Sequence, residues 1–171
     1  MIRIPLFALL FAVTAVWAVA QDPTAGHDQH EDHDNHDDHV AEAAGIRAIH
    51  GWTNATTGGS ALVFVDIENR SDAVVTLLGA EADIAAGVEL VALENVGGEL
   101  RYTTIPQMPV APGVKVVLAP NGLALRLDGL FGSHEGGHFT VDLLLDDATL
   151  SVTIEIESAD AMQHSHAGHS H

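Results

Sequence analysis

Short apolar runs recur at regular spacing between Ile46 and Glu157, separated by Gly, Pro, Asn and Asp. Most of these runs are rich in Val, Leu, Ile and Thr, and several alternate apolar with polar positions, as in residues 151–156 (SVTIEI). Alternation with a period of two predicts β-strands whose side chains point to opposite faces of a sheet. We therefore expect strands at residues 46–52, 61–68, 73–82, 88–94, 99–104, 114–118, 123–128, 139–145 and 149–157.

Turn-forming residues lie between the expected strands, for example Gly58-Gly59 and Pro120-Asn121-Gly122. Many short strands separated by such turns are typical of an all-β sandwich or barrel, and roughly 110 residues are enough for one core. No pattern predicts a helix longer than two turns, and residues 80–86 are expected to form a short helical or turn-like piece at most. The pattern therefore predicts a single antiparallel β-sandwich domain at residues 46–157.

The chain on either side of this domain has a different composition. Residues 21–45 contain eight acidic residues, no basic residue and hardly any large apolar side chain. Such a segment cannot bury enough apolar surface to offset the entropy of ordering, so we expect it to be disordered until it binds metal. Residues 158–171 form a second, histidine-rich tail.

The first twenty residues have the features of a secretory signal peptide. Arg3 gives a short basic start, residues 4–16 are an apolar run, and Ala18-Val19-Ala20 fits the small residues that precede signal cleavage. We expect residues 1–20 to be removed and the protein to be periplasmic or secreted, with an uncleaved membrane anchor as the alternative. The chain has no cysteine, so a metal site must use nitrogen, oxygen and thioether ligands, and neither a lipid-modified cysteine nor a disulfide is available.

The chain is strongly acidic, with a formal net charge of −18 from 6 basic and 24 acidic residues. Cleavage after Ala20 would remove one basic residue and no acidic one, which changes the charge to −19. Charge of this sign disfavours nucleic acid as a partner, repels anionic membranes and concentrates cations. The composition therefore favours a protein whose partners are metal ions.

Nine of the twelve histidines lie in the two tails. In residues 26–39 (GHDQHEDHDNHDDH) a histidine stands at every third position, and a polyproline II chain with three residues per turn would align them on one edge. Imidazole is the commonest protein ligand for transition metals, and the alternative, a merely solvated acidic tail, would need no histidine. The predicted metal ligands are His27, His30, His33, His36 and His39 in the first tail and Met162, His164, His166, His169 and His171 in the second.

The two tails differ in the ions that they suit. The histidine and aspartate run suits Cu(II) or Zn²⁺, while Met162 beside His164 and His166 gives a mixed thioether and imidazole set that tolerates Cu(I). Copper is expected first, since Cu(II) outcompetes Zn²⁺ at equal ligands, and zinc second. Affinity should fall as the pH drops through about 6.5, because a protonated imidazole has no lone pair to donate.

Three other histidines and one methionine lie in the expected domain. Residues 134–138 (HEGGH) match the His-Glu-x-x-His motif of zinc proteases, but that motif works on a helix, which the glycines oppose. A loop-borne metal site using His134 and His138, or a plain solvated loop, are the other interpretations. His50, in the first expected strand, and Met108, a loop or core residue, are weaker ligand candidates. We expect no enzyme activity.

Several short motifs follow one another along the domain: GW at 51–52, a strand at 61–69 ending in NRSD at 69–72, LLGA at 77–80, GVEL at 87–90, IPQMPVAPGVKVVL at 105–118, and PNGL at 120–123 leading to GL at 129–130. In order and spacing they resemble the periplasmic copper chaperones of the PCu(A)C type, over residues 49–157. This resemblance implies a cupredoxin-like, immunoglobulin-like β-sandwich, copper binding, and a metal-receiving periplasmic partner such as an oxidase assembly factor or subunit.

The resemblance also assigns positions to the family's copper(I) ligands, which are a histidine, a methionine and a His-x-Met pair. Aligned without gaps, these positions hold Val91, Tyr102, Ala124 and Arg126 in this chain. None of the four is a copper(I) ligand of the family kind, and Arg126 adds a positive charge where the family holds a cation. The tails therefore remain the predicted metal sites, and the domain is expected to carry them.

Two hypotheses for the function follow. The first is a metal-binding protein that buffers or hands on copper, with zinc second, through its two tails. The second is a zinc-scavenging protein, or an interaction or scaffold module that has lost the core copper site. In such a module, histidine protonation near pH 6 would change association, as expected of an imidazole with a pKa of about 6.5.

Overall fold

The computed structural model describes residues 40–165, so the expected signal peptide, the histidine run at 26–39 and residues 166–171 lie outside the described part. Within residues 40–165 the chain forms eleven strands and no helix, and therefore no helical span long and apolar enough to cross a membrane. The strands are β1 (Val40–Ala43), β2 (Ile46–Asn54), β3 (Gly59–Asn69), β4 (Val75–Glu81), β5 (Gly87–Val96), β6 (Glu99–Thr104), β7 (Met108–Val110), β8 (Lys115–Leu118), β9 (Leu123–Leu130), β10 (His138–Leu145) and β11 (Thr149–Glu157).

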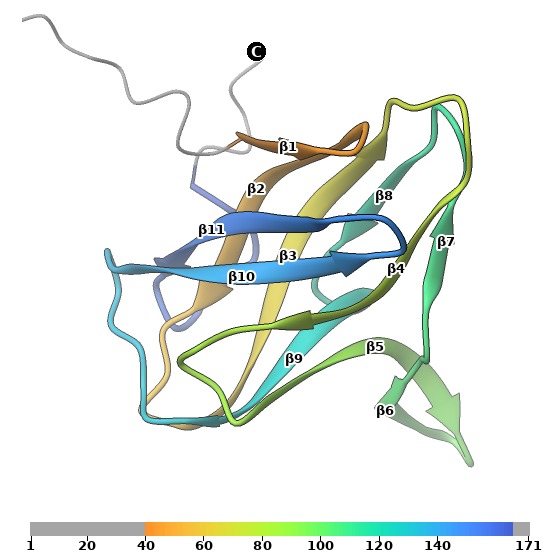
Figure 1. Cartoon of the computed structure of the whole chain (residues 1–171). Coiled ribbons are helices and arrows are strands. Elements are labelled where there is room, and N and C mark those ends of the chain that lie inside the picture. Colours follow the sequence, from red (N-terminus) through yellow and green to blue (C-terminus); the bar gives the residue numbers. More distant parts are fainter. Residues whose placement is uncertain (1–39, 166–171) are drawn as a thin grey trace, which may run out of the picture. The chain divides into compact units, whose positions relative to one another are not determined.

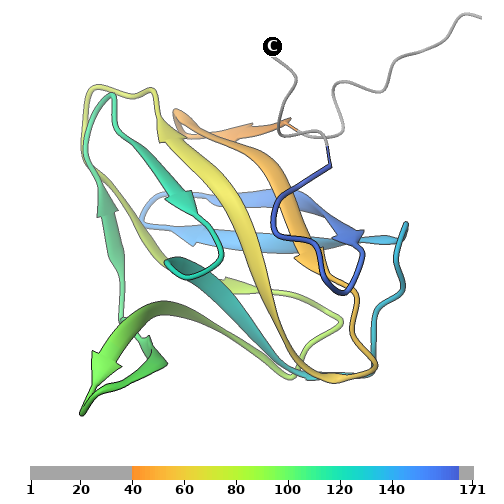
Figure 2. The ribbon, with the colours of Figure 1, turned by 180° about the vertical axis from the view of Figure 1, so that it is seen from behind.

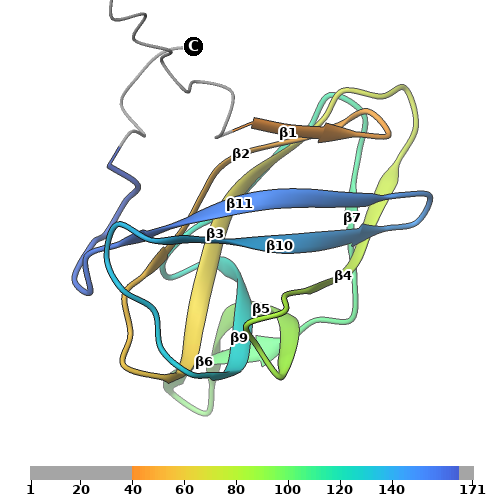
Figure 3. The same cartoon turned by 60° about the vertical axis from the view of Figure 1, so that its left-hand side comes forward.

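The strands join in one hydrogen-bonded sheet in the order β6-β5-β9-β8-β3-β2-β11-β10-β4-β7, with β1 paired to β2. The sheet folds over, so that β10 and β11 lie across β3 as a second layer (Figure 1, Figure 3). Most neighbours are antiparallel, but β2 pairs in parallel with β11, and β8 meets β9 in parallel at Leu118 and Leu123. The predicted all-β sandwich is confirmed, and the two parallel pairings are a departure from the expected antiparallel pattern.

The space between the two layers is filled by side chains that alternate along the strands. Val63, Val65 and Ile67 of β3 are buried and point inward, because every second residue of a strand faces the same side. Val152 and Ile154 of β11 belong to the same buried cluster from the other layer. Burial of apolar surface stabilises a fold by about 25 cal/mol per Å², so this shared core holds the two layers together.

A smaller apolar cluster lies on the opposite face of β3. Phe64 stands between two inward-facing residues, so its ring points away from the main core, and it packs on Trp52 of β2 with ring centroids 4.7 Å apart. Val91 of β5 and Ala124 of β9 complete the buried part of this cluster. We call this side of β2, β3, β8, β9 and β5 the outer face, and Figure 2 shows the domain from this side.

A buried asparagine fixes the turn after β3. Asn69 is 0% exposed, and its Nδ2 donates to the carbonyl oxygens of Ala73 and Val110, at 2.8 Å in each case. Its Oδ1 accepts hydrogen bonds from the backbone N and the hydroxyl of Ser71, at 2.9 and 2.7 Å. Because a buried amide is costly without partners, these bonds tie the turn and β7 to the end of β3.

The expectation that residues 21–45 are disordered is wrong for residues 40–43, which form β1. This strand pairs with Ile46–Ile49 of β2 through a two-residue turn in which Ala44 and Gly45 have φ values of 50° and 75°. Two consecutive left-handed residues suit a tight hairpin, but alanine at the first position is rare there and gives no sequence signal. β7 also lies where no strand is expected, because Pro109 at its centre argues against one.

Candidate metal centre

Past β11 the chain continues as residues 158–165, which we call the C-terminal segment, and lies against the outer face of β2 (Figure 2). Asn54 at the end of β2 anchors it: Nδ2 donates to the carbonyl oxygens of Ser158 and Ala161, at 3.0 and 2.9 Å. Ala161 also packs on the apolar cluster around Trp52. The path of the segment is therefore set by the domain, which decides where its side chains lie.

The C-terminal segment ends on a buried contact between His164 and Glu157. His164 is 1% exposed, and its Nδ1 lies 2.6 Å from Oε1 of Glu157. The same oxygen accepts hydrogen bonds from the backbone N and the hydroxyl of Ser165, at 2.9 and 2.8 Å. Burial raises the pKa of the Glu157 carboxyl, but the hydrogen bonds from Ser165 and His164 outweigh it, so that this pKa lies below the ordinary value of 4.5. Glu157 is thus a carboxylate at neutral pH and favours the imidazole tautomer that carries its proton on Nδ1 and its lone pair on Nε2.

A second carboxylate lies near the other imidazole nitrogen. Glu155 and Glu157 alternate with buried isoleucines along β11, so both carboxylates are on the outward side of this strand. Oε2 of Glu155 lies 3.8 Å from Nε2 of His164, and one ligand atom from each of the three residues lies within 4.8 Å of the others. Glu155 and Glu157 line a cavity of about 470 Å³ that His138 also borders. Carboxylate and imidazole ligands at this separation suit Zn²⁺ or Cu(II).

His164 also borders a second cavity, of about 250 Å³, on the outer face. His50 and Trp52 of β2 line it together with Met162 of the C-terminal segment. The ring centroids of His50 and His164 are 6.0 Å apart, with the ring planes inclined by 53°. The rest of the lining is mainly apolar and consists of Val65, Asp66, Lys115, Val117, Leu118, Ala119, Pro120 and Gln163. Two imidazoles and a thioether therefore border one small cavity.

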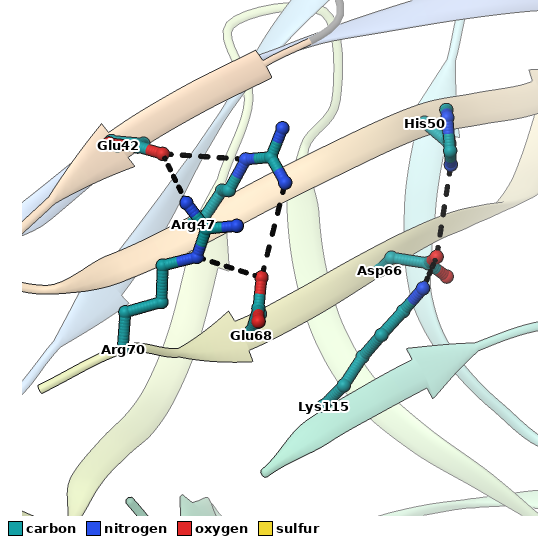
Figure 4. A network of polar contacts seen from close by, with 7 residues as sticks. All are labelled: Glu42, Arg47, His50, Asp66, Glu68, Arg70 and Lys115. Atoms are coloured by element: carbon teal, nitrogen blue, oxygen red, sulfur yellow. Dashed lines mark hydrogen bonds and ion pairs between the residues drawn. The ribbon is translucent and has the colours of Figure 1, made fainter. Parts of the chain in front are cut away.

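The two charged residues of this cavity pair with each other. Nζ of Lys115 lies 2.5 Å from Oδ2 of Asp66, and Nδ1 of His50 lies 3.8 Å from the same oxygen (Figure 4). Asp66 comes from β3 and Lys115 from β8, so the pair spans neighbouring strands of the outer face. The positive and negative charge offset each other, which leaves the cavity close to neutral.

His50 has a backbone conformation that is uncommon for a residue with a side chain. Its φ is 55°, in the left-handed region, which costs roughly 1–2 kcal/mol for residues other than glycine. His50 and Gly51 form a bulge between the part of β2 that pairs with β1 and the part that pairs with β11. Bulges re-aim side chains, and here the bulge places the imidazole of His50 in the cavity beside Trp52.

Four charged residues tie β1 to the sheet near this bulge (Figure 4). Arg47 of β2 lies between two carboxylates, with Nε 3.4 Å from Glu42 of β1 and a guanidinium nitrogen 4.0 Å from Glu68 of β3. Arg70 contacts the same two carboxylates at 3.3 and 2.9 Å. The network holds β1 against β2 and thereby fixes the point at which the preceding chain joins the domain.

A comparison with protein families gives a match over residues 46–158, which is most of the chain, to the model named LpqE-like and described as an LpqE-like lipoprotein. The chain belongs to the LpqE-like family. The word lipoprotein describes the family, since the 171 residues of this LpqE-like chain include no cysteine. No curated protein matches the chain.

The LpqE-like domain has the fold of PCuAC domains, as the sequence resemblance predicts. The apo PCuAC domain of PmoF2 matches with a TM-score of 0.61 and 19% identity, over 73% of this chain and 99% of that one. The copper-bound PCuAC domain from PmoF2 matches with a TM-score of 0.58 and 17% identity, over 70% and 98%. The Cu(I) form of DR1885 from Deinococcus radiodurans matches with a TM-score of 0.51 and 19% identity, over 64% and 78%. At such identities these matches show the fold.

In this LpqE-like domain, three of the four positions that the resemblance assigns to copper ligands belong to the apolar cluster around Trp52 or pack on it. Val91 of β5 pairs with Ala124 of β9, and both are 0% exposed. Tyr102 packs on the same cluster, while Arg126 forms an ion pair with Glu89. The ligand-bearing side chains of the outer face lie elsewhere, around His50 and the C-terminal segment.

Of the ten predicted ligands, two fall within the described residues. Met162 is 69% exposed, and His164 is buried in a packed segment rather than carried on a loose tail. The other eight lie outside the described residues: His27, His30, His33, His36, His39, His166, His169 and His171. Glu155 and Glu157 also belong to the centre, and neither was among the predicted ligands. Their alternation with isoleucines at the end of β11, which places them on one face of the strand, is visible in the sequence.

The other candidate residues of the domain are His134, His138 and Met108. Residues 134–138 form a turn closed by a hydrogen bond from Gly137 N to His134 O at 3.1 Å, and Gly136 has a φ of 78°. His138 begins β10, so the two histidines do not share a helical face as in the zinc protease motif. Met108 is 8% exposed and belongs to the main core.

Proposed function

We propose that this LpqE-like protein binds copper first and zinc second outside the cytoplasm, and buffers or hands on the ions through its histidine-rich segments. The domain serves as their carrier, and no bond-making catalysis takes part. The observation that carries the proposal is the contact between His164 and Glu157. A carboxylate that holds one imidazole nitrogen orients the other toward a metal ion, as around most metal-bound histidines.

Copper as the first ion is supported by the fold. Solved structures with this fold include a copper-bound PCuAC domain and the Cu(I) form of DR1885. The acidic chain concentrates cations, and histidines in runs without an enforced geometry exchange ions more readily than a closed cage. Such exchange is what a donor of metal ions needs.

An extracytoplasmic location is supported by the signal-like residues 1–20 and by the lipoprotein description of the family. The receiving partner would be a periplasmic protein with its own copper ligands, such as an oxidase assembly factor or subunit. Histidine segments joined to a docked domain raise the effective metal concentration at the receiving site without any new contact.

The test is a titration of the full chain with Cu(II) and Zn²⁺. The comparison is a variant in which the eight predicted histidine ligands outside the described residues are replaced by asparagine, which keeps polarity but removes the imidazoles. We expect the wild-type chain to bind several ions and the eightfold variant to lose most of them. Substitution is preferable to truncation after Glu157, since Ala161 and His164 pack on the domain. Equal stoichiometry in the two proteins would refute the proposal.

The apolar surroundings of Val91 and Ala124 favour a second candidate function, an interaction module that lacks the family's copper site. Protonation of the histidines near pH 6 would then lower the negative charge and change association. An oligomer that forms equally with and without metal, and only at low pH in sedimentation measurements, would support this function over metal transfer.

A further inference from the structure

The small cavity on the outer face brings together three potential metal ligands from distant parts of the chain. We propose that His50, Met162 and His164 form one copper(I) site in the domain. This inference rests on the proposed function and deepens it: beside the histidine-rich segments, the domain holds one fixed site for the monovalent ion.

The ligand set selects the ion. Thioethers are soft ligands that favour Cu(I), and imidazole accompanies them well, whereas carboxylates suit harder ions. His50, Met162 and His164 are neutral as ligands, and most of the cavity lining is apolar. The cost of moving an ion out of water rises steeply with its charge, so neutral ligands in mainly apolar surroundings favour a monovalent over a divalent ion.

The separation of the two imidazoles fits one shared ion. An imidazole nitrogen lies about 2 Å from a bound first-row ion, so the ring centroids of two imidazoles on one ion stand roughly 5–6.5 Å apart. The centroids of His50 and His164 are 6.0 Å apart. Met162 lies two residues before His164 and borders the same cavity, so its thioether is the third candidate ligand.

Each imidazole is already held in place by its surroundings. Nδ1 of His164 lies 2.6 Å from Glu157, so Nε2, which lies 3.8 Å from Oε2 of Glu155, is the nitrogen that would bind the ion. Asn54 anchors the segment that carries this histidine. The bulge with its left-handed residue fixes His50 on the opposite wall. A strained backbone beside an oriented imidazole indicates a position shaped for binding rather than for strand pairing alone.

The cavity also lies where both histidine-rich stretches join the domain. Val40 pairs with Ile49, the residue before His50, and the first histidine run ends at His39, directly before Val40. The C-terminal histidines follow His164 in the sequence. Both histidine-rich stretches are therefore adjacent in sequence to residues that lie near this cavity.

The test is an anaerobic titration in which the full chain competes with a coloured chelator for one equivalent of Cu(I). The site variants are His50→Asn, since asparagine tolerates a left-handed backbone, and Met162→Leu, which keeps the size of the side chain. His134→Asn and Met108→Leu are the matched controls, because neither residue borders the cavity. We expect each site variant to weaken Cu(I) binding about tenfold or more, and each control to change it less than about twofold.

X-ray absorption of the Cu(I) form supplies a structural readout. Wild-type protein should show one sulfur and two nitrogen ligands, with the sulfur lost in Met162→Leu and kept in Met108→Leu. The eightfold asparagine variant should keep this one tight Cu(I) ion while losing the other ions. Conversely, His50→Asn should keep the multiple Cu(II) or Zn²⁺ ions, so the two proposals fail in different experiments.

An affinity within about twofold of wild type in either His50→Asn or Met162→Leu would overturn the three-ligand site. Loss of Cu(I) binding in Glu155→Gln alone would also overturn it, because the ion would then lie on the carboxylate side of His164. A wild-type chain that binds no copper or zinc would instead refute the proposed function on which the site rests.

Discussion

The backbone of Gly51 passes so close to β11 that a Cβ on it would lie 2.7 Å from the carbonyl oxygen of Thr153 and 2.8 Å from Cδ1 of Ile154. Gly51→Ala should therefore push β2 away from β11 and destabilise the domain by about 1–3 kcal/mol, as overpacking does. Chemical denaturation measures the loss. Gly79→Ala is the control, since a Cβ at Gly79 would meet nothing within 4 Å. Equal stability of the two variants would contradict the close approach.

Replacing the buried Asn69 should destabilise the domain more than replacing an exposed asparagine. Asn69→Ala leaves the buried carbonyl oxygens of Ala73 and Val110 without their donor, which should lower the free energy of unfolding by about 2–3 kcal/mol. Asn95→Ala serves as the comparison, because Asn95 is exposed and accepts one hydrogen bond, from Gly98 N at 2.8 Å. Thermal or urea unfolding of both variants tests the difference. Equal losses of unfolding free energy in Asn69→Ala and Asn95→Ala would contradict this role of Asn69 in the turn.

The strands were predictable from sequence because a two-layer core imposes a strict alternation. In β11 the pattern of residues 149–157 gives both ends of the strand. The bounds of β6 also match the expected run 99–104, although its residues are mostly exposed. The strands β1 and β7 were not predictable, because each contains or adjoins a residue that usually argues against a strand or a tight hairpin. β1 depends on left-handed Ala44, and β7 contains Pro109, so their pairing is decided by neighbours far away in the sequence.

For the candidate metal centre, the sequence predicts which types of residue act as ligands but not where they lie or which residues surround them. Met162 and His164 could be identified as ligands because histidines cluster in the C-terminal stretch, but nothing local predicts that His164 is buried. Its position depends on Asn54 and Glu157, which contact it or its segment through folding of the whole domain. His50 could not be recognised as its neighbour, since the bulge that aims it arises where β2 changes partners from β1 to β11.

Asn54 should control how firmly the C-terminal segment covers the outer face. Asn54→Ala removes two hydrogen bonds, to Ser158 and Ala161, and should weaken the attachment of the segment by about 1–2 kcal/mol. Hydrogen exchange of residues 158–165 should then accelerate, and acrylamide should quench Trp52 more strongly. A Trp17→Phe background leaves Trp52 as the reporter, because the chain has 2 tryptophans. Unchanged exchange and quenching would show that apolar packing of Ala161 alone holds the segment.

We expect the C-terminal segment of the metal-free protein to be released at low pH, when Glu157 becomes protonated. Its pKa is lower in the folded chain than the ordinary 4.5, so the carboxylate adds stability that is fully present above 4.5 and is lost as the pH falls through the lowered pKa. Protonation removes the charge that accepts hydrogen bonds from His164 and Ser165. The protection factors of residues 158–165, measured with a chelator present between neutral pH and the onset of unfolding, should therefore fall only below 4.5.

Glu157→Gln is the matched variant for this acid release, because the amide keeps the size of the side chain but has no proton to gain. Its C-terminal segment should be held less firmly at neutral pH, since the charge-assisted hydrogen bonds from His164 and Ser165 are weakened. It should also lack the acid step seen in the wild-type chain. Glu155→Gln should retain that step, because Glu155 makes no hydrogen bond to Ser165 among those found in residues 40–165. A release midpoint above 4.5, or the same acid step in Glu157→Gln, would show that another group controls the segment.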